Sequence, residues 1–184
     1  MADASRRAVF LDRDGTIVED PGFLHQPGKV RLLAGAGEAI HQLNQAGWLV
    51  ITVSNQSGIA RGLYGAAAYQ AVQRRLVELL AAHDARLDGA YFCPHHPAFT
   101  GPCECRKPGL LLFREAQAAL GLDLTRCCWV GDRLGDVEPA RKLGGRALLV
   151  ETGGGATHVG KARALRIPVV ADLAAAAAEI VRGA

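Results

Sequence analysis

Short hydrophobic runs alternate along this chain with longer segments whose apolar residues recur at helical spacing. The runs at residues 8–11, 48–53, 90–93, 127–130 and 147–150 predict buried strands, and a further short strand is expected near Val169. Helical patterns cover residues 36–46, 66–83, 110–120, 137–143 and 172–182. Because strands and helices alternate, we expect an α/β fold with a doubly wound, mostly parallel sheet and helices on both faces. We expect a single domain over residues 1–184 and no large cap domain, because no gap between the polar motifs is long enough to hold one.

Three connecting segments carry weak helical and strand signals. Residues 19–28 are rich in turn-forming residues and are expected to form an irregular flap over the neighbouring strand end, with an ordinary surface loop as the alternative. Residues 94–105 should form neither helix nor strand, because they contain Pro94, Pro97, Gly101 and Pro102. Residues 155–162 nearly match a phosphate-binding P-loop but lack the Ser or Thr after Lys161 that would bind Mg²⁺. We therefore expect a loop beside the last strand there.

The composition fits a folded protein that acts on a small anion. Hydrophobic residues make up 49% and charged residues 21% of the 184 residues, which favours a packed core and excludes extensive disorder. The net charge of +3 is too small to indicate nucleic-acid binding and suits an anionic small substrate. Cys127 and Cys128 lie in an apolar run and are expected to be buried thiols. No run reaches membrane-spanning length and no apolar signal core follows the N-terminus, so we expect a cytoplasmic protein. With no exposed apolar stripe to call for a partner, we expect a monomer.

Polar side chains cluster after four of the predicted strands. They are Asp12 and Asp14, Ser54 and Asn55, Arg106 and Lys107, and Asp132 followed a turn later by Asp136. Because the carboxyl ends of parallel strands share one sheet edge, we expect these groups to converge. Phosphoryl transfer needs such a set, namely a nucleophile, a cation, donors for the phosphate oxygens and a proton source. Asp12 and Asp14 are the expected metal-assisted nucleophile and acid pair, and an acidic turn punctuated by Gly15 is the alternative.

A segment rich in cysteine precedes the basic pair Arg106 and Lys107. Its possible metal ligands are Cys93, His95, Cys103 and Cys105. Three thiolates and one imidazole suffice for a tetrahedral structural zinc site in the loop 93–105. His96 is an alternative to His95, and a set of reduced thiols without metal is the other alternative. We expect zinc to order this loop and to position the two cations that follow it.

The order of the motifs resembles that of a known superfamily. Asp-x-Asp-Gly-Thr at 12–16, Ser-Asn at 54–55, Lys-Pro at 107–108 and Gly-Asp-x-x-x-Asp at 131–136 resemble the four motifs of the haloacid dehalogenase (HAD) superfamily. Within it, the strings at 55–62, 93–97 and 103–108 resemble those of the D-glycero-D-manno-heptose 1,7-bisphosphate 7-phosphatase family. The resemblance implies a Mg²⁺-dependent phosphatase that removes the C7 phosphate of this small sugar phosphate through an aspartyl-phosphate. It also implies a place in the biosynthesis of ADP-heptose for lipopolysaccharide, with no nucleic-acid or membrane partner.

The resemblance implies a role for each motif residue. Asp12 would be the nucleophile, Asp14 the general acid and base, and Lys107 the cation that stabilises the phosphoryl group. Mg²⁺ would be bound by the carboxylates of Asp12 and Asp132 and by the backbone carbonyl of Asp14, an oxygen set that suits this ion. The residues expected to recognise the substrate are Ser54, Arg106, Asp20, Pro21, Gly22, Phe23, Asn55, Gln56, Ser57 and Arg133. The zinc ligands would again be Cys93, His95, Cys103 and Cys105. Whether Asp136 contacts the metal or lies only at a helix N-terminus stays open.

Two features of the chain depart from that family. Ser54 stands where Thr is commoner, and the loop between His95 and Cys103 is shorter than expected. The identity and anomer of the substrate therefore stay open, and histidinol-phosphate phosphatase, which shares the Asp-x-Asp and cysteine-loop patterns, is the alternative enzyme. A zinc-stabilised interaction module is the alternative outside the enzymes.

Overall fold

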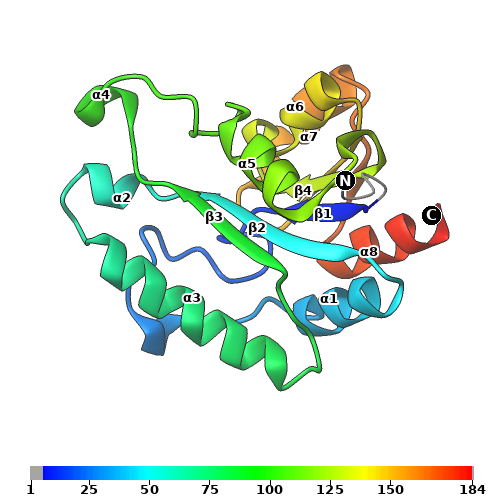
Figure 1. Ribbon diagram of the computed structural model, residues 1–184, viewed down its shortest axis with the longest axis horizontal. Helices are drawn as coiled ribbons and strands as arrows, with labels where there is room; N and C mark the ends of the chain where they lie inside the picture. Colours follow the sequence, from blue (N-terminus) through cyan, green and yellow to red (C-terminus); the bar gives the residue numbers. More distant parts are fainter. Residues whose placement is uncertain (1–5, 184) are drawn as a thin grey trace.

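A parallel sheet forms the centre of the protein (Figure 1). The computed structural model describes residues 6–183. The strands within that range are β1 (Ala8–Leu11), β2 (Leu49–Asn55), β3 (Gly89–Cys93), β4 (Cys128–Gly131), β5 (Arg146–Val150) and β6 (Val169–Val170). They lie in the order β3-β2-β1-β4-β5-β6, and every neighbouring pair is parallel. The expected doubly wound parallel sheet is therefore confirmed.

Helices cover both faces of the sheet, as the alternating pattern predicts. They are α1 (Ala36–Gln45), α2 (Ser57–Ala60), α3 (Ala66–Ala81), α4 (Pro97–Thr100), α5 (Leu111–Leu120), α6 (Leu134–Leu143), α7 (Val159–Ala164) and α8 (Leu173–Arg182). Short 3₁₀ helices cover Pro27–Lys29, Leu124–Arg126 and Gly155–His158. Helices α1, α3 and α8 pack on one face, and α5, α6 and α7 pack on the other (Figure 1).

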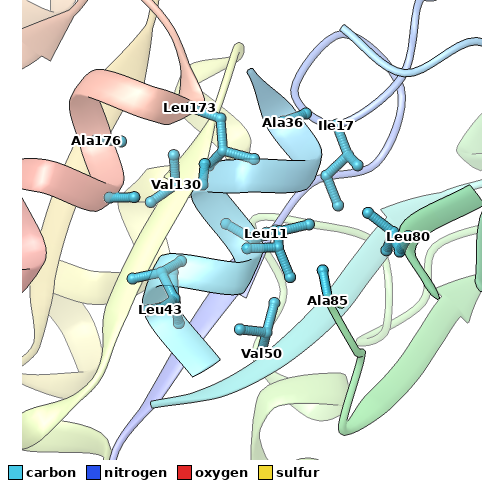
Figure 2. Close-up of a cluster of buried hydrophobic side chains, with 14 of the residues drawn as sticks. Leu11, Ile17, Ala36, Leu43, Val50, Leu80, Ala85, Val130, Leu173 and Ala176 are labelled. Carbon is cyan, nitrogen blue, oxygen red and sulfur yellow. The ribbon is translucent and has the colours of Figure 1, made fainter. Parts of the chain in front are cut away.

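The two faces of β1 divide the core between these layers. Val9 and Leu11 face the cluster under α1, α3 and α8, part of which is shown in Figure 2. Ala8 and Phe10 face the opposite cluster, where the Phe10 ring centroid lies 4.9 Å from that of Trp129. Because side chains alternate along a strand, an uninterrupted apolar run is required wherever both faces are covered. All four residues of β1 are buried for this reason.

Two of the loop predictions are wrong. Residues 97–100 form the one-turn helix α4 although the loop was expected to exclude helix. Pro97 occupies the first helical turn, where a missing N–H costs nothing, and the side chain of His96 accepts a hydrogen bond from Ala98 N. Residues 155–164 form a 3₁₀ turn and then α7 in place of the expected loop, and Ala162 buries its methyl group against the sheet.

The strand order determines where a ligand can bind. Consecutive crossovers from β1 run in opposite directions, first toward β2 and β3 and later toward β4 to β6. The crevice at the carboxyl ends of β1 and β4 is thus the topological switch point, the usual binding position in open α/β sheets. Residues 6–183 contain no large cap domain over this edge, in agreement with the prediction. None of the helices in this range combines the length and hydropathy required to cross a bilayer.

Candidate active site

Three carboxylates meet at the switch point. Asp12 follows β1 directly and donates its backbone N–H to Val130 O of the neighbouring strand at 3.0 Å. Asp132 follows β4, and Asp136 lies in the first turn of α6. One carboxylate oxygen from each of these aspartates lies within 4.8 Å of the others. The parallel register of β1 and β4 therefore converts a separation of 120 positions in sequence into direct proximity.

Lys107 reaches this carboxylate cluster with a side chain that is only 2% exposed. Its Nζ lies 2.7 Å from Asp12 Oδ1 and 2.8 Å from Asp136 Oδ1, and it also donates to Val53 O. Burial alone would lower the pKa of Lys107, but the charges of Asp12 and Asp136 outweigh this effect and raise it. The lysine is therefore a fixed positive charge beside Asp12.

The backbone of Lys107 is fixed as well. Its N–H donates to Asn55 Oδ1 at 3.0 Å, and Asn55 Nδ2 donates back to Lys107 O at 3.3 Å. Asn55 is the last residue of β2, so the amide connects the end of that strand to the segment that carries the lysine. The sequence predicted Asn55 as a substrate contact, and the structure adds this second contact to Lys107.

Asp132 offers one carboxylate oxygen to a cation. Its side chain is fully buried; Oδ2 accepts from Gly154 N at 2.8 Å, whereas Oδ1 is buried with no hydrogen-bond partner among residues 6–183. Burial and the neighbouring charge of Asp136 raise its pKa to about 6 against the opposing Gly154 N–H. Burial, with Asp136, Asp132 and Asp14, likewise raises the pKa of Asp12, although Lys107 opposes this. Oxygen ligands with unfavourable buried charge fit a hard divalent cation such as Mg²⁺.

Two glycines wrap around Asp132. Gly15 has φ +89° and Gly153 has φ +58°, and a Cβ at either position would lie 2.5 Å from Asp132 Oδ2. Thr152 holds the Gly15 backbone beside Asp132 by donating its hydroxyl to Gly15 O at 2.7 Å. The glycine of the Asp-x-Asp-Gly-Thr motif is therefore required by its packing against Asp132 as well as by the turn that the sequence suggests.

The Asp14 carboxylate lies outside the three-carboxylate cluster. Arg13 Nε and Nη2 donate to its two oxygens at 3.0 and 2.9 Å, and Gln56 Nε2 donates to Oδ2 at 3.0 Å. Tyr64 in turn donates its hydroxyl to Gln56 Oε1 at 2.6 Å. Arg13 is fully buried, and its Cζ lies 5.2 Å from the Tyr69 ring centroid. Sequence reasoning missed Arg13 and Tyr64 as parts of the site, because Arg13 occupies the unspecified position of Asp-x-Asp and Tyr64 follows no predicted strand.

A pocket of about 260 Å³ opens beside the cluster. It is lined by Asp12, Asp14, Asp20, Gly22, Phe23, Leu24, Asn55, Gln56, Ser57, Tyr64, Arg106, Arg133 and Asp136. The structure thus brings most of the predicted substrate contacts to one pocket. Pro21 and Ser54 are not in the lining, and Ser54 is buried, with its hydroxyl 3.2 Å from Gln56 Nε2.

The flap contacts the opposite side of the pocket. Arg133 Nη2 lies 3.6 Å from Asp20 Oδ2, which connects residues 19–28 to the start of α6. Asp136 caps the same helix, because its Oδ2 accepts from Arg133 N at 3.0 Å. Asp136 therefore combines the helix-capping position with a place in the carboxylate cluster.

The four predicted zinc ligands also converge. The sulfur atoms of Cys93, Cys103 and Cys105 and a ring nitrogen of His95 lie within 4.8 Å of one another. Cys105 Sγ is 2.9 Å from Cys93 Sγ and 3.2 Å from His95 Nδ1. His96 lies outside this group and uses Nδ1 to cap α4. Three thiols and one imidazole at this separation are a donor set that could hold a metal ion and that suits tetrahedral zinc.

The fold and the aspartate–lysine site define a HAD-type hydrolase. In agreement, a HAD-hydrolase-like family model matches residues 104–176. The D-glycero-beta-D-manno-heptose-1,7-bisphosphate 7-phosphatase of Haemophilus ducreyi is 38% identical over 165 residues, covering 86% of this chain and 91% of the relative. The protein of the same name from Yersinia pestis is 39% identical and covers 85% and 87%. This chain therefore belongs to the D-glycero-beta-D-manno-heptose-1,7-bisphosphate 7-phosphatase family.

A solved structure supports the same assignment. The D,D-heptose 1,7-bisphosphate phosphatase from B. bronchiseptica, complexed with magnesium and phosphate, superposes with a TM-score of 0.88 at 34% identity. The match covers 97% of this chain and 99% of that one. The chain is thus an enzyme of the phosphoric monoester hydrolase class, and neither the histidinol-phosphate alternative nor the non-enzymatic zinc module is favoured.

Proposed function

We propose that this protein removes the C7 phosphate of D-glycero-D-manno-heptose 1,7-bisphosphate with the help of Mg²⁺. The observation that carries the proposal is the contact of 2.7 Å between Asp12 and the buried Lys107, next to the unpartnered oxygen of Asp132. Phosphoryl transfer requires a nucleophile, a fixed cation and a carboxylate oxygen that can bind a metal ion. The identity of the sugar is inferred from the names of the relatives.

The reaction proceeds in two steps on the chain's own residues. An Asp12 oxygen attacks the C7 phosphorus, so that an aspartyl–phosphate bond forms and the bond from phosphorus to the sugar oxygen breaks. Asp14 protonates the leaving sugar oxygen and then accepts a proton from the water that hydrolyses the intermediate. Lys107 balances the negative charge on the phosphoryl oxygens in both steps.

Mg²⁺ would be held by the carboxylates of Asp12 and Asp132 and by the backbone carbonyl of Asp14. The bound ion would neutralise the phosphate charge as a Lewis acid. Zinc would be held by Cys93, His95, Cys103 and Cys105 and would order the chain immediately before the catalytic lysine. Arg106 lies between these two parts, because its guanidinium donates to His95 O at 3.4 Å while it lines the pocket.

The remaining pocket residues would recognise the sugar. Asp20, Gly22 and Phe23 approach from the flap, Gln56 and Ser57 from the junction of β2 and α2, and Arg133 from the N-cap of α6. We further propose that the enzyme works in the cytoplasm, in the synthesis of ADP-heptose for lipopolysaccharide. All five cysteines are free thiols, which suits a reducing compartment.

A comparison of two substrates tests the proposal. Purified protein with Mg²⁺ is given heptose 1,7-bisphosphate or histidinol phosphate, and the rate of phosphate release is measured for each. We expect kcat/KM to be at least about 100-fold higher for the heptose, because a pocket built around polar donors rejects a ligand that cannot pair them. Equal rates, or faster release from histidinol phosphate, would contradict the proposed substrate.

A further inference from the structure

One arginine outside the pocket lining is held between two exposed aromatic rings. Arg61 follows α2 directly, and its Cζ lies 4.8 Å from the ring centroid of Phe99 in α4 and 5.6 Å from that of Phe23 in the flap. Phe23 lines the pocket, whereas Phe99 belongs to the cysteine-rich loop. Helices α2 and α4 both lie beyond the carboxyl ends of β2 and β3 (Figure 1). Arg61 therefore stands at the rim of the active site, where three distant segments of the chain meet.

The hydrogen-bond donors of Arg61 are free. Its side chain makes no hydrogen bond or ion pair with any residue in the described range 6–183. Arg133, by contrast, lies 3.6 Å from Asp20, and Arg106 donates to His95 O. Aromatic faces hold the plane of a guanidinium and leave the N–H groups at its edge available. Within the part of the chain that the structure describes, Arg61 is thus an oriented cation with no carboxylate partner.

The proposed substrate carries a charge that the catalytic cluster cannot balance. Each phosphate of a sugar bisphosphate has about −1.5 to −2 charges at neutral pH. One phosphate would bind at Asp12 and Lys107, and the other must lie farther out on the sugar. The pocket lining contributes four carboxylates, at Asp12, Asp14, Asp20 and Asp136, against the two guanidinium groups of Arg106 and Arg133, so further positive charge at the rim favours a bisphosphate.

We propose that Arg61, held between Phe23 and Phe99, binds the phosphate group that is not removed, alongside Arg106. The inference rests on the proposed function, since only a substrate with a second phosphate needs this contact. It makes Arg61 a residue that determines specificity for bisphosphates. It also gives the flap and the cysteine-rich loop a shared role, because each supplies one ring that orients the guanidinium.

The test compares two sugars and the variant Arg61→Met, which keeps an apolar side chain against both rings. kcat/KM is measured for heptose 1,7-bisphosphate and for heptose 7-phosphate, which lacks the second phosphate. We expect Arg61→Met to lower kcat/KM for the bisphosphate by about 10- to 100-fold, the value of a hydrogen-bonded charge pair. For the monophosphate the change should stay below about twofold, because the contact is absent there. Arg61→Lys should recover part of the loss on the bisphosphate alone.

Arg75→Met is the matched control, because Arg75 is an exposed arginine of α3 outside the pocket lining. It should leave both substrates unchanged. Phe99→Leu keeps the Arg61 charge but removes one ring, and should raise KM for the bisphosphate about two- to fivefold, the value of an exposed cation–π contact. If the wild type hydrolyses neither sugar, the proposed function fails and this inference falls with it. If the wild type hydrolyses the bisphosphate but Arg61→Met affects both sugars equally, or neither, only the role of Arg61 is overturned.

Discussion

Asn55 and Lys107 exchange two hydrogen bonds across the active site, one from the lysine N–H to Asn55 Oδ1 and one from Asn55 Nδ2 to the lysine carbonyl. The lysine lies 52 positions later in the sequence, on a segment without regular structure. A strand end therefore fixes the backbone that carries the main cation of the site. Asn55 is a positioning residue in this arrangement, whether or not it also touches the substrate.

We expect Asn55→Ala to lower kcat by about 10- to 100-fold, because a small displacement of a catalytic group has effects of this size. KM should change much less, since the cation acts mainly on the transition state. Asn55→Asp keeps the acceptor for the lysine N–H and should fall between wild type and Asn55→Ala. Gln73→Ala removes a hydrogen bond to Thr52 in the same strand and serves as the control in steady-state kinetics. A loss confined to KM in Asn55→Ala would show a direct substrate contact in place of positioning.

The buried carboxylate of Asp132 predicts a pH dependence for the metal-free protein. Its pKa of about 6 in the folded state exceeds the ordinary value of 3.8, so the folded state binds this proton more tightly than the unfolded chain. The free energy of unfolding should therefore fall as the pH rises from about 4 to about 6, by on the order of 2–3 kcal/mol from this group. Urea unfolding of chelated protein at a series of pH values measures the effect. Asp132→Asn should flatten the profile, and parallel profiles for the two proteins would exclude this cause.

The geometry of the cysteine-rich cluster predicts that His95, and not His96, is the zinc ligand. If the cluster holds zinc as proposed, wild type should carry the metal, and double replacement of Cys103 and Cys105 by Ser should abolish zinc binding, measured as metal per protein chain. Activity should fall strongly, because Arg106 and Lys107 follow the cluster directly. His95→Ala should also lose zinc, whereas His96→Ala should keep it, since His96 Nδ1 caps α4 and lies outside the cluster. Full activity in a zinc-free double variant would show that the metal does not position these cations.

The pairing of Arg13 with Asp14 predicts an effect of a residue that no motif marks. Arg13→Met should lower kcat about 10- to 100-fold by releasing the Asp14 carboxylate from its fixed orientation. It should also lower the free energy of unfolding by about 1–3 kcal/mol, because a buried charged hydrogen-bond pair is broken. Arg13→Lys can restore one of the two bonds and should recover part of both losses. Wild-type kcat in Arg13→Met would show that Gln56 alone orients Asp14.

The sequence predicts the sheet and the position of its active edge because both depend on uninterrupted apolar runs. The runs ending at Leu11 and Val130 become neighbouring strands, and the polar residues that follow them must then meet. The order of the motifs adds the residue types. The predicted strand at 48–53 is slightly short, since Ser54 and Asn55 continue the ladder as far as Cys93 of β3.

The features of the fold and the site that the sequence did not predict depend on contacts seen only in the folded chain. Arg13 is a charged residue with no apolar pattern, and its burial depends on the ion pair with Asp14 and on the ring of Tyr69. Helix α4 was missed because proline and glycine indicate loops in a one-dimensional reading, whereas Pro97 begins a helical turn that His96 caps. The two hydrogen bonds between Asn55 and Lys107 join the end of β2 to a segment without regular structure, so no hydrophobic pattern predicts them.

Asp12 is the proposed nucleophile that attacks the phosphorus atom, and trapping the covalent intermediate tests this role most directly. An ester with a good leaving group, p-nitrophenyl phosphate, needs no proton from Asp14, so Asp14→Asn should form the aspartyl-phosphate and hydrolyse it slowly. After acid quenching, peptide mass spectrometry should locate one phosphoryl group on Asp12, and Asp12→Asn should carry none. A phosphoryl group on another residue, or turnover by Asp12→Asn near the wild-type rate, would contradict the account.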